Sequence, residues 1–419
     1  MAYFPHTEND VQAMLQTIGA KSIDELFAAV PEKLKNSEFP EFKPISEIDL
    51  LAEINELRHQ QTGQTVSFLG GGRYAHYIPP VVPALAGRSE FYTAYTPYQP
   101  EISQGTLTAI YEFQSMICEL TGLDIANASL YDGATALAEA VSMAAAATGR
   151  LEYVIANPLH PNYQAVLKTY LGPRNITGQK NITPNTAAVI FVLPDFHGLL
   201  SNWQEYLAKA RENGALFIVC ADPLLLSVIE PPTADITVGE AQPLGLPQNY
   251  GGPALGYLAA KKDFLRQMPG RIAGRTTDDR GQRPFVLTMQ TREQHIRREK
   301  ATSNICSNQA LCALMATIYM SYLGTRGLQT VAKLCKANTD YAKQKLGNIP
   351  GFSVDKGEHF RDFVLHCPVS AQKINEALAP NYKIGLPLDD KNLLLSVTEK
   401  TTKEQINKLA KELSGWQKN

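Results

Sequence analysis

Apolar, strand-like runs alternate with helical segments between residues 106 and 270, and this alternation constrains the fold more than any other feature of the sequence. The expected strands are 153–156, 187–193, 215–220, 235–238 and 255–259, and the expected helices are 107–120, 134–147, 162–170 and 203–213. Strands that alternate with helices form a mostly parallel sheet that helices cover on both faces. The sequence therefore predicts a large α/β domain, which we place at residues 64–303.

The segment that precedes this domain, residues 1–63, predicts an N-terminal helical arm that packs on something else. It contains three pairs of a side-chain acceptor and a carboxylate three residues later, a pattern typical of helix N-termini. The pairs are Thr7 with Asp10, Ser22 with Glu25, and Ser46 with Asp49.

The segment that follows, residues 304–419, predicts a small C-terminal α+β domain. Long helices are expected at 304–323 and 328–346, with a further helix at 371–378. Short strands are expected at 363–367 and 393–397, before a last helix that begins at Thr401 with Glu404 in its first turn. A chain of 419 residues is long enough for both domains and the arm.

Composition excludes several classes of protein. The formal net charge of -2 argues against a protein that binds nucleic acid through bulk charge. No apolar run approaches the roughly 20 residues that a membrane helix needs. The first residues lack the features of a secretory signal, and the 6 cysteines are scattered without a C-x-x-C pair. We therefore expect a cytoplasmic protein with free thiols and with no metal site, membrane partner or nucleic-acid partner.

Four polar residues lie where open α/β sheets bind their ligands, after strands or at helix starts. Asp132 begins the alanine-rich helix, where free N–H groups could bind a phosphate, or where its carboxylate acts as an ordinary N-cap. Asp222 could hold the pyridinium nitrogen of pyridoxal phosphate, or serve as the turn residue before Pro223. His160 could stack on a planar cofactor or line a pocket, and His197 carries the same ambiguity, with a packed loop histidine as the alternative for both.

The Gly/Pro-rich loop 239–253 is the most informative segment. Pyridoxal-phosphate enzymes of this kind carry their Schiff-base lysine at about this place, and only a primary amine forms that bond. No lysine occurs between Lys209 and Lys261. The chain thus has the frame of such an enzyme without its covalent anchor. The alternative is a self-sufficient enzyme that uses a lysine elsewhere.

Two other segments are candidates for binding surfaces. Residues 64–105 are rich in glycine, proline and aromatic residues, and long irregular segments of this kind carry binding surfaces or pack as loops. Residues 266–300 are basic, with acidic residues interleaved. This basic stretch is either a surface that steers an acidic partner or an ion-paired structural hairpin.

The sequence strongly resembles the P protein of the glycine cleavage system, the pyridoxal-phosphate-dependent glycine decarboxylase. The resemblance rests on long runs and covers nearly the whole chain. The runs are Tyr92–Gly105 (YTAYTPYQPEISQG), Leu120–Ser129 (LTGLDIANAS), Met268–Ile272 (MPGRI) and Gln290–Ile305 (QTREQHIRREKATSNI). In this family the two homologous halves form one chain or two separate subunits, and this sequence is similar to the separate α subunit, or subunit 1.

The resemblance implies a fold and a division of labour. The fold implied is aspartate-aminotransferase-like, the fold-type I architecture of pyridoxal-phosphate-dependent transferases. Gln242 stands at the position of the cofactor lysine, so no cofactor is expected on this chain. Pyridoxal 5'-phosphate is expected on the β subunit of an α2β2 heterotetramer. A remnant pocket is expected near Asp132, His160 and Asp222.

The implied reaction is that of glycine dehydrogenase (aminomethyl-transferring). Glycine is decarboxylated, and its aminomethyl group passes to the lipoyl arm of H protein. A half without the lysine is not expected to be active alone, and the alternatives are a chain that completes the β active site and one that only stabilises β. Candidate residues of the active-site or β-interface loop are Tyr95, Tyr98, Gln99, Glu101 and Gln104. Candidate contacts with H protein or with an interface are Arg292, Arg297 and Arg298.

Overall fold

The computed structural model describes residues 5–35, 42–60, 65–379 and 381–416. Contacts divide the chain into two units, Met1–Gly63 and Gln64–Asn419. The predicted arm boundary falls within residues 61–64 and so lies outside the described residues. The further division of the second unit at residue 304 stays a prediction.

The first unit is helical, as its helix-start patterns predicted. Its helices are α1 (Glu8–Ile18), α2 (Glu32–Lys35) and α3 (Glu47–Gln60), with a 3-10 turn at Ile23–Phe27. Thr7 and Asp10 form the predicted capping box, and Ser46 accepts from the Asp49 amide at 3.3 Å. The prediction for Ser22 was wrong, because its side chain caps nothing and the Glu25 carboxylate instead accepts from the Lys21 amide.

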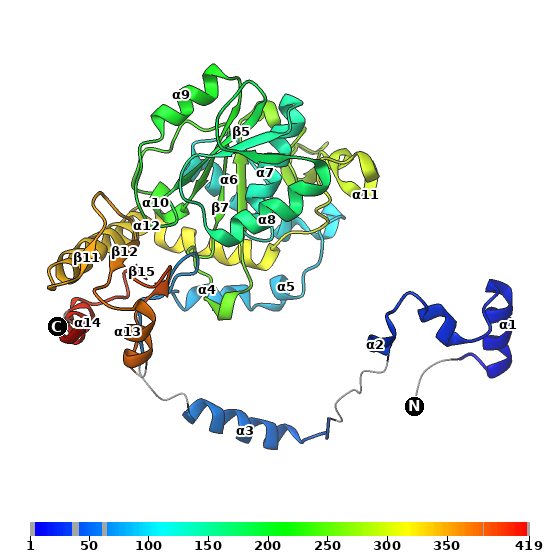
Figure 1. Cartoon of the computed structure of the whole chain (residues 1–419). Helices are drawn as coiled ribbons and strands as arrows, with labels where there is room; N and C mark the ends of the chain where they lie inside the picture. Colours follow the sequence, from blue (N-terminus) through cyan, green and yellow to red (C-terminus); the bar gives the residue numbers. More distant parts are fainter. Residues whose placement is uncertain (1–4, 36–41, 61–64, 380, 417–419) are drawn as a thin grey trace. The chain divides into compact units, whose positions relative to one another are not determined.

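The second unit is built around a seven-stranded sheet (Figure 1), in the order β2-β8-β7-β6-β5-β3-β4. The strands are β2 (Ile125–Ala126), β3 (Glu152–Ile155), β4 (Thr177–Gln179), β5 (Thr186–Leu193), β6 (Leu216–Ala221), β7 (Ile236–Glu240) and β8 (Gly256–Ala260). The five strands from β7 to β4 are parallel, whereas β8 and β2 are antiparallel to their neighbours. The predicted mostly parallel sheet is confirmed.

Helices bury both faces of this sheet. Every residue of β5 is buried, and from Ala188 to Leu193 the side chains alternate between two hydrophobic clusters. Val189 and Phe191 pack with α6 (Gln104–Thr121) and α9 (Gln204–Glu212), whereas Ala188 and Ile190 pack with α7 (Gly133–Thr148) and α8 (Pro161–Leu171). This burial on both sides explains the uninterrupted apolar run in the sequence.

One long helix, α12 (Ala310–Gly347), replaces the two helices predicted at 304–323 and 328–346. Its backbone leaves the helical region only at Gly324, with φ 59°. The predicted start at Asn304 was wrong, because tertiary hydrogen bonds hold the residues before Ala310. Ser129 Oγ accepts from the Gln309 amide and from the Asn308 side chain, both at 3.1 Å.

The C-terminal part forms a small antiparallel sheet in the order β11-β12-β15-β14, with helices beside it. The elements are β11 (Ser353–Val354), β12 (Asp362–His366), α13 (Ala371–Leu378), β13 (Tyr382–Lys383), β14 (Leu386–Pro387), β15 (Asn392–Ser396) and α14 (Lys403–Leu413). β13 pairs with β1 (Val66–Ser67). The predicted cap of the last helix is wrong by one residue, because Thr402 and Gln405 form the capping box.

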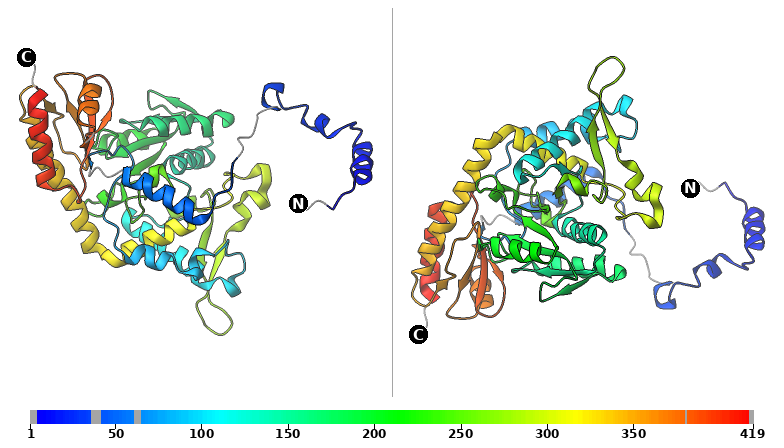
Figure 2. Two further views of the ribbon diagram at one scale, coloured as in Figure 1. Left: turned by 90° about the horizontal axis from the view of Figure 1, so that it is seen from below. Right: turned by 90° about the horizontal axis from the view of Figure 1, so that it is seen from above.

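Short elements complete the second unit. They are α4 (Val81–Ala86), α5 (Ser89–Tyr92), α10 (Pro223–Leu226), α11 (Gln294–Arg297), β9 (Ile272–Arg275) and β10 (Phe285–Thr288). β9 and β10 form an antiparallel hairpin, which Figure 2 shows extending from the sheet domain. No helix among the described residues has the length and apolar character needed to cross a membrane. All 6 cysteines are free, and Cys306 alone among them is exposed.

Candidate functional site

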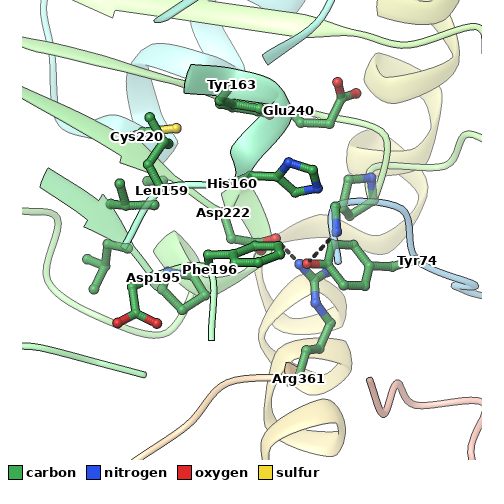
Figure 3. Close-up of a pocket in the computed structure, with 16 residues that line it drawn as sticks. Tyr74, Leu159, His160, Tyr163, Asp195, Phe196, Cys220, Asp222, Glu240 and Arg361 are labelled. Atoms are coloured by element: carbon green, nitrogen blue, oxygen red, sulfur yellow. Dashed lines mark hydrogen bonds and ion pairs between the residues drawn. The ribbon is translucent and has the colours of Figure 1, made fainter. Parts of the chain in front are cut away.

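The carboxyl ends of β5 and β6 open onto a cavity of about 100 Å³ (Figure 3). Its lining comes from the carboxyl ends of β5, β6 and β7, from loops, and from Arg361 immediately before β12. The polar members and their aromatic neighbours are Tyr74, His160, Tyr163, Asp195, Phe196, Asp222, Glu240 and Arg361. Ligands bind at this edge of open α/β sheets, so this is the candidate site.

Asp222 and Arg361 form an ion pair inside this cavity. Asp222 immediately follows β6 and caps α10, with Oδ1 accepting from the amides of Leu224 and Leu225 at 2.9 and 3.1 Å. Arg361 precedes β12 of the small sheet, is 1% exposed and has φ 50°. Burial alone would lower the pKa of Arg361, but the Asp222 carboxylate raises it above its usual value. Arg361 therefore keeps its positive charge inside the cavity.

Tyr74 covers the guanidinium of this pair, as Figure 3 shows. The guanidinium carbon lies 3.6 Å from the centre of the Tyr74 ring, a cation–π contact. The Tyr74 hydroxyl donates to Asp362 at 2.7 Å. Burial raises the pKa of Asp362 to about 6, and the nearby Arg361 opposes that rise.

A buried hydrogen-bond chain extends from Arg361 to Glu399. Arg361 Nη1 lies 2.8 Å from His76 Nε2, and His76 Nδ1 lies 2.7 Å from Glu399 Oε2. Because Arg361 can only donate, we assign the His76 proton to Nδ1. Cys335 completes a group of ligand types that could hold a metal. The guanidinium beside His76 opposes a cation there, and Glu399 is already paired.

Gln242, at the predicted lysine position, is a fully buried structural amide. Its Oε1 accepts from the Tyr74 amide at 3.0 Å. Its Nε2 donates to the carbonyls of Tyr74 and Leu246 at 3.0 and 2.7 Å. Gln242 thus links the loop after β7 to the segment that carries Tyr74.

The start of α7 is occupied by carboxylates. Asp132 Oδ1 accepts from the Thr135 amide at 2.7 Å, and Glu240 Oε2 accepts from the Gly133 amide at 3.1 Å. Burial raises the pKa of Glu240, which Arg73 opposes. These two carboxylates satisfy donors that a phosphate would otherwise use.

The predicted pocket residues are only partly brought together. His160 and Asp222 line the cavity, whereas Asp132 and His197 do not. His160 also caps α8, with Nδ1 accepting from the Asn162 amide at 3.0 Å, so both interpretations of this residue apply. Burial lowers the pKa of His160 and so favours the neutral form of its ring.

Sequence reasoning missed Arg361, Tyr74 and Glu240. Glu240 lies in the lysine-free loop and Tyr74 in the aromatic segment, so both lay within segments that drew attention. The only signal for Arg361 is the Arg-Asp pair that stands immediately before an apolar strand. A pairing 139 residues apart leaves no local pattern.

The candidate loop residues differ in their surroundings. Tyr95 is 89% exposed, and Gln99 and Glu101 are exposed as well. Tyr98 contacts Arg271, with its hydroxyl 3.3 Å from Nη2. Gln104 is structural within this chain, because its amide bonds to the Phe285 backbone at 2.9 Å in both directions.

The basic stretch contains the β9–β10 hairpin, but its three candidate arginines are not alike. Arg292 is 9% exposed, and its guanidinium donates to the carbonyls of Met268, Gly270 and Met289. Arg297 and Arg298 are exposed and pair with no carboxylate in the described part of the chain. Of the three candidate arginines, only Arg297 and Arg298 are accessible to a partner protein.

The fold and the position of the site define a protein of the fold-type I class of pyridoxal-phosphate-dependent transferases. A sphingosine-1-phosphate lyase from Burkholderia pseudomallei shares this fold with a TM-score of 0.64 over 92% of this chain, at 14% identity. A mutant of the cystine C–S lyase C-DES, solved with glycine covalently linked to its pyridoxal-phosphate cofactor, shares it with a TM-score of 0.59 over 86% of this chain and 99% of its own, at 14% identity.

Within this class, the chain belongs to the family of the glycine cleavage system P-protein, whose model matches residues 1–413. The probable glycine dehydrogenase (decarboxylating) subunit 1 of Desulforamulus reducens is 46% identical, over 99% of both chains. Its counterpart in Desulfitobacterium hafniense is 44% identical over 98% of both. An inhibitor-bound crystal structure of glycine decarboxylase (P-protein) has a TM-score of 0.87 and 41% identity, covering 99% of this chain and 100% of that one.

The residues of the cavity do not fit pyridoxal phosphate. The cofactor requires a lysine amine and a free acidic or basic partner for its ring nitrogen. Gln242 supplies no amine, and Asp222 is already paired with Arg361. A cavity of about 100 Å³ is also smaller than the roughly 300 Å³ at the low end of ligand pockets.

Proposed function

We propose that this chain is the α subunit, or subunit 1, of a two-subunit glycine decarboxylase of the glycine cleavage system. In this proposal, pyridoxal phosphate resides on a homologous β subunit and supplies the electron sink for glycine decarboxylation. The aminomethyl group then passes to the lipoyl arm of H protein. This chain binds no cofactor, and its role is to complete the β active site and to provide docking surface.

One observation carries the proposal that the cofactor lies elsewhere. A pyridinium nitrogen would need Asp222 as its partner, but this carboxylate already pairs with Arg361. The ring of Tyr74 covers the Arg361 guanidinium. Glu240 satisfies the α7 amide of Gly133. The family membership and the name "subunit 1" of the relatives support a second subunit. We further propose an α2β2 assembly in the cytoplasm.

The test is to express the chain with and without β. We expect the isolated chain to lack bound cofactor and glycine–bicarbonate exchange, and the reconstituted complex to have both. A borohydride-trappable cofactor on the isolated chain would instead identify a self-sufficient enzyme. Exchange by β alone at the full rate would leave this chain a purely stabilising role.

A further inference from the structure

Arg271 is a buried cation without an anionic partner. It stands between Gly270 and β9 and is 4% exposed. Its Nη2 donates to the Cys306 carbonyl at 2.7 Å, and its guanidinium carbon lies 5.4 Å from the centre of the Tyr98 ring. Its Nε has no hydrogen-bond partner among the described residues. No carboxylate in the described part of the chain pairs with it.

The two other buried arginines of the described residues have stronger partners, although Nε of Arg361 also lacks one. Arg361 pairs with Asp222, and all three nitrogens of Arg292 donate to backbone carbonyls. A buried charge without a partner is costly, so proteins compensate such groups. The described part of this chain therefore supplies no anionic group to pair with Arg271.

Arg271 lies in the wall of a cavity of about 210 Å³, and this Arg271 cavity shares no residue with the site described above. Apolar walls come from α5, α6 and α12 and from the loop that follows α5. The lining includes Phe91, Tyr92, Tyr95, Ile110, Leu311 and Leu314, with Ser307 and Asn308 as polar neighbours. Arg271 is the only charged residue in the lining.

We propose that the Arg271 cavity binds a carboxylate whose apolar remainder lies against the aromatic wall. A guanidinium presents parallel N–H groups that match a planar carboxylate. A single cation balances a monoanion rather than a phosphate dianion. The carboxylate comes either from a free small molecule or from an acidic side chain of a partner subunit. The second source rests on the proposed function, whereas the first does not.

The first experiment measures the thermal stability of the full-length chain in phenylacetate and in phenylacetamide at equal ionic strength. Both probes have the same apolar body, but only phenylacetate carries a charge. We expect phenylacetate alone to raise Tm by mass action. Arg271→Met should weaken phenylacetate binding at least about tenfold, because a charge-assisted hydrogen bond is lost. Arg275→Met, at an exposed arginine four residues on, is the matched control and should bind normally.

The second experiment identifies the source by measuring association with the β subunit. If a partner carboxylate fills the cavity, phenylacetate and Arg271→Met both weaken association, whereas Arg275→Met does not. If the ligand is a free molecule, association is unchanged and the complex still binds phenylacetate. Arg271→Lys, which keeps the charge, guards against misfolding and should retain part of either effect. The proposal fails if both probes act alike on the chain and Arg271→Met associates normally. A chain that binds no β subunit overturns the proposed function but leaves the first experiment decisive.

Discussion

The guanidinium of Arg361 pairs with the carboxylate of Asp222 at the end of β6, 139 residues earlier in the chain. The pair joins the residue before β12 of the small sheet to the residue after β6 of the large, mostly parallel sheet. It also neutralises the acidic group best placed to bind a ligand at this edge. The chain itself thus supplies the cation that pairs with this carboxylate.

Loss of one partner of the Asp222–Arg361 pair should destabilise the fold strongly, because the other group is then buried without its partner. Arg361→Met leaves a buried carboxylate unpaired, so we expect the free energy of unfolding to fall by about 3–5 kcal/mol. The double variant Asp222→Asn/Arg361→Met removes both charges, while the Asn side-chain oxygen can still cap α10. It should therefore be more stable than Arg361→Met alone. Denaturant unfolding of both variants measures this difference.

An exposed ion pair provides the control for this cycle. Lys209 and Glu205 lie on α9 at 2.6 Å and are largely exposed. Lys209→Met should cost less than about 1 kcal/mol. A similar cost for Arg361→Met would contradict the importance of the buried pair.

A lysine introduced at position 242 should not enable this chain to bind pyridoxal phosphate. The ammonium of Gln242→Lys cannot accept a hydrogen bond from the Tyr74 amide. We therefore expect the free energy of unfolding to fall by about 1–3 kcal/mol. Arg361 and Glu240 still occupy the positions that a cofactor would need. Pyridoxal phosphate added to this variant should give no more borohydride-sensitive Schiff-base absorbance than with the native chain, because exposed lysines such as Lys209 react equally in both. A trapped adduct at residue 242 would show that the cavity can still admit the cofactor.

The sequence predicted the large sheet because burial on both faces leaves continuous apolar runs, as in β5. It predicted the cap Thr7, and it offered a cap as one of two interpretations of Asp132, because capping is local. It could not predict the pairing of Arg361 with Asp222, which depends on how two sheets meet. The role of Gln242 was likewise hidden, since a glutamine that satisfies two backbone segments has no sequence signature.

Stability should depend on pH through Glu139, a buried residue of α7 whose Oε2 lacks a hydrogen-bond partner within the described chain. Burial raises the pKa of this carboxyl from 4.5 to about 7, against the effects of Ser303 and Arg174. A raised acid pKa means that the fold prefers the protonated form. Its contribution to stability is therefore complete below the unfolded pKa and is lost as pH rises through about 7.

Glu139→Gln removes this dependence. Relative to the native chain, we expect the variant to gain up to about 3 kcal/mol well above the folded pKa and to gain little in mildly acidic buffer. Urea unfolding at two pH values measures the difference. Glu119→Gln, at an exposed position on α6, serves as the control and should show no such change. An equal effect of Glu139→Gln at both pH values would contradict the prediction.

The exposed end of the basic stretch tests the steering hypothesis. Arg297→Glu/Arg298→Glu should raise the KM for H protein several-fold at low salt, with less effect at high salt, because steering charges are screened. Stability should be unchanged, since both side chains are exposed. Arg292 is unsuitable for this test, because charge reversal there breaks three buried hydrogen bonds. An unchanged KM in a folded complex would exclude the hypothesis.

Variants in the aromatic-rich segment 64–105 should distinguish a catalytic role of this segment from a structural one. Tyr95 is 89% exposed, so Tyr95→Ala should leave the free energy of unfolding within about 0.5 kcal/mol of the native value. If the loop reaches the β active site, turnover of the reconstituted complex should nevertheless fall about tenfold or more. Gln104→Ala is the matched contrast, because it breaks the Phe285 backbone bonds and should cost about 1–3 kcal/mol. Normal turnover and assembly with Tyr95→Ala would assign this loop no catalytic role and favour a subunit that only stabilises its partner.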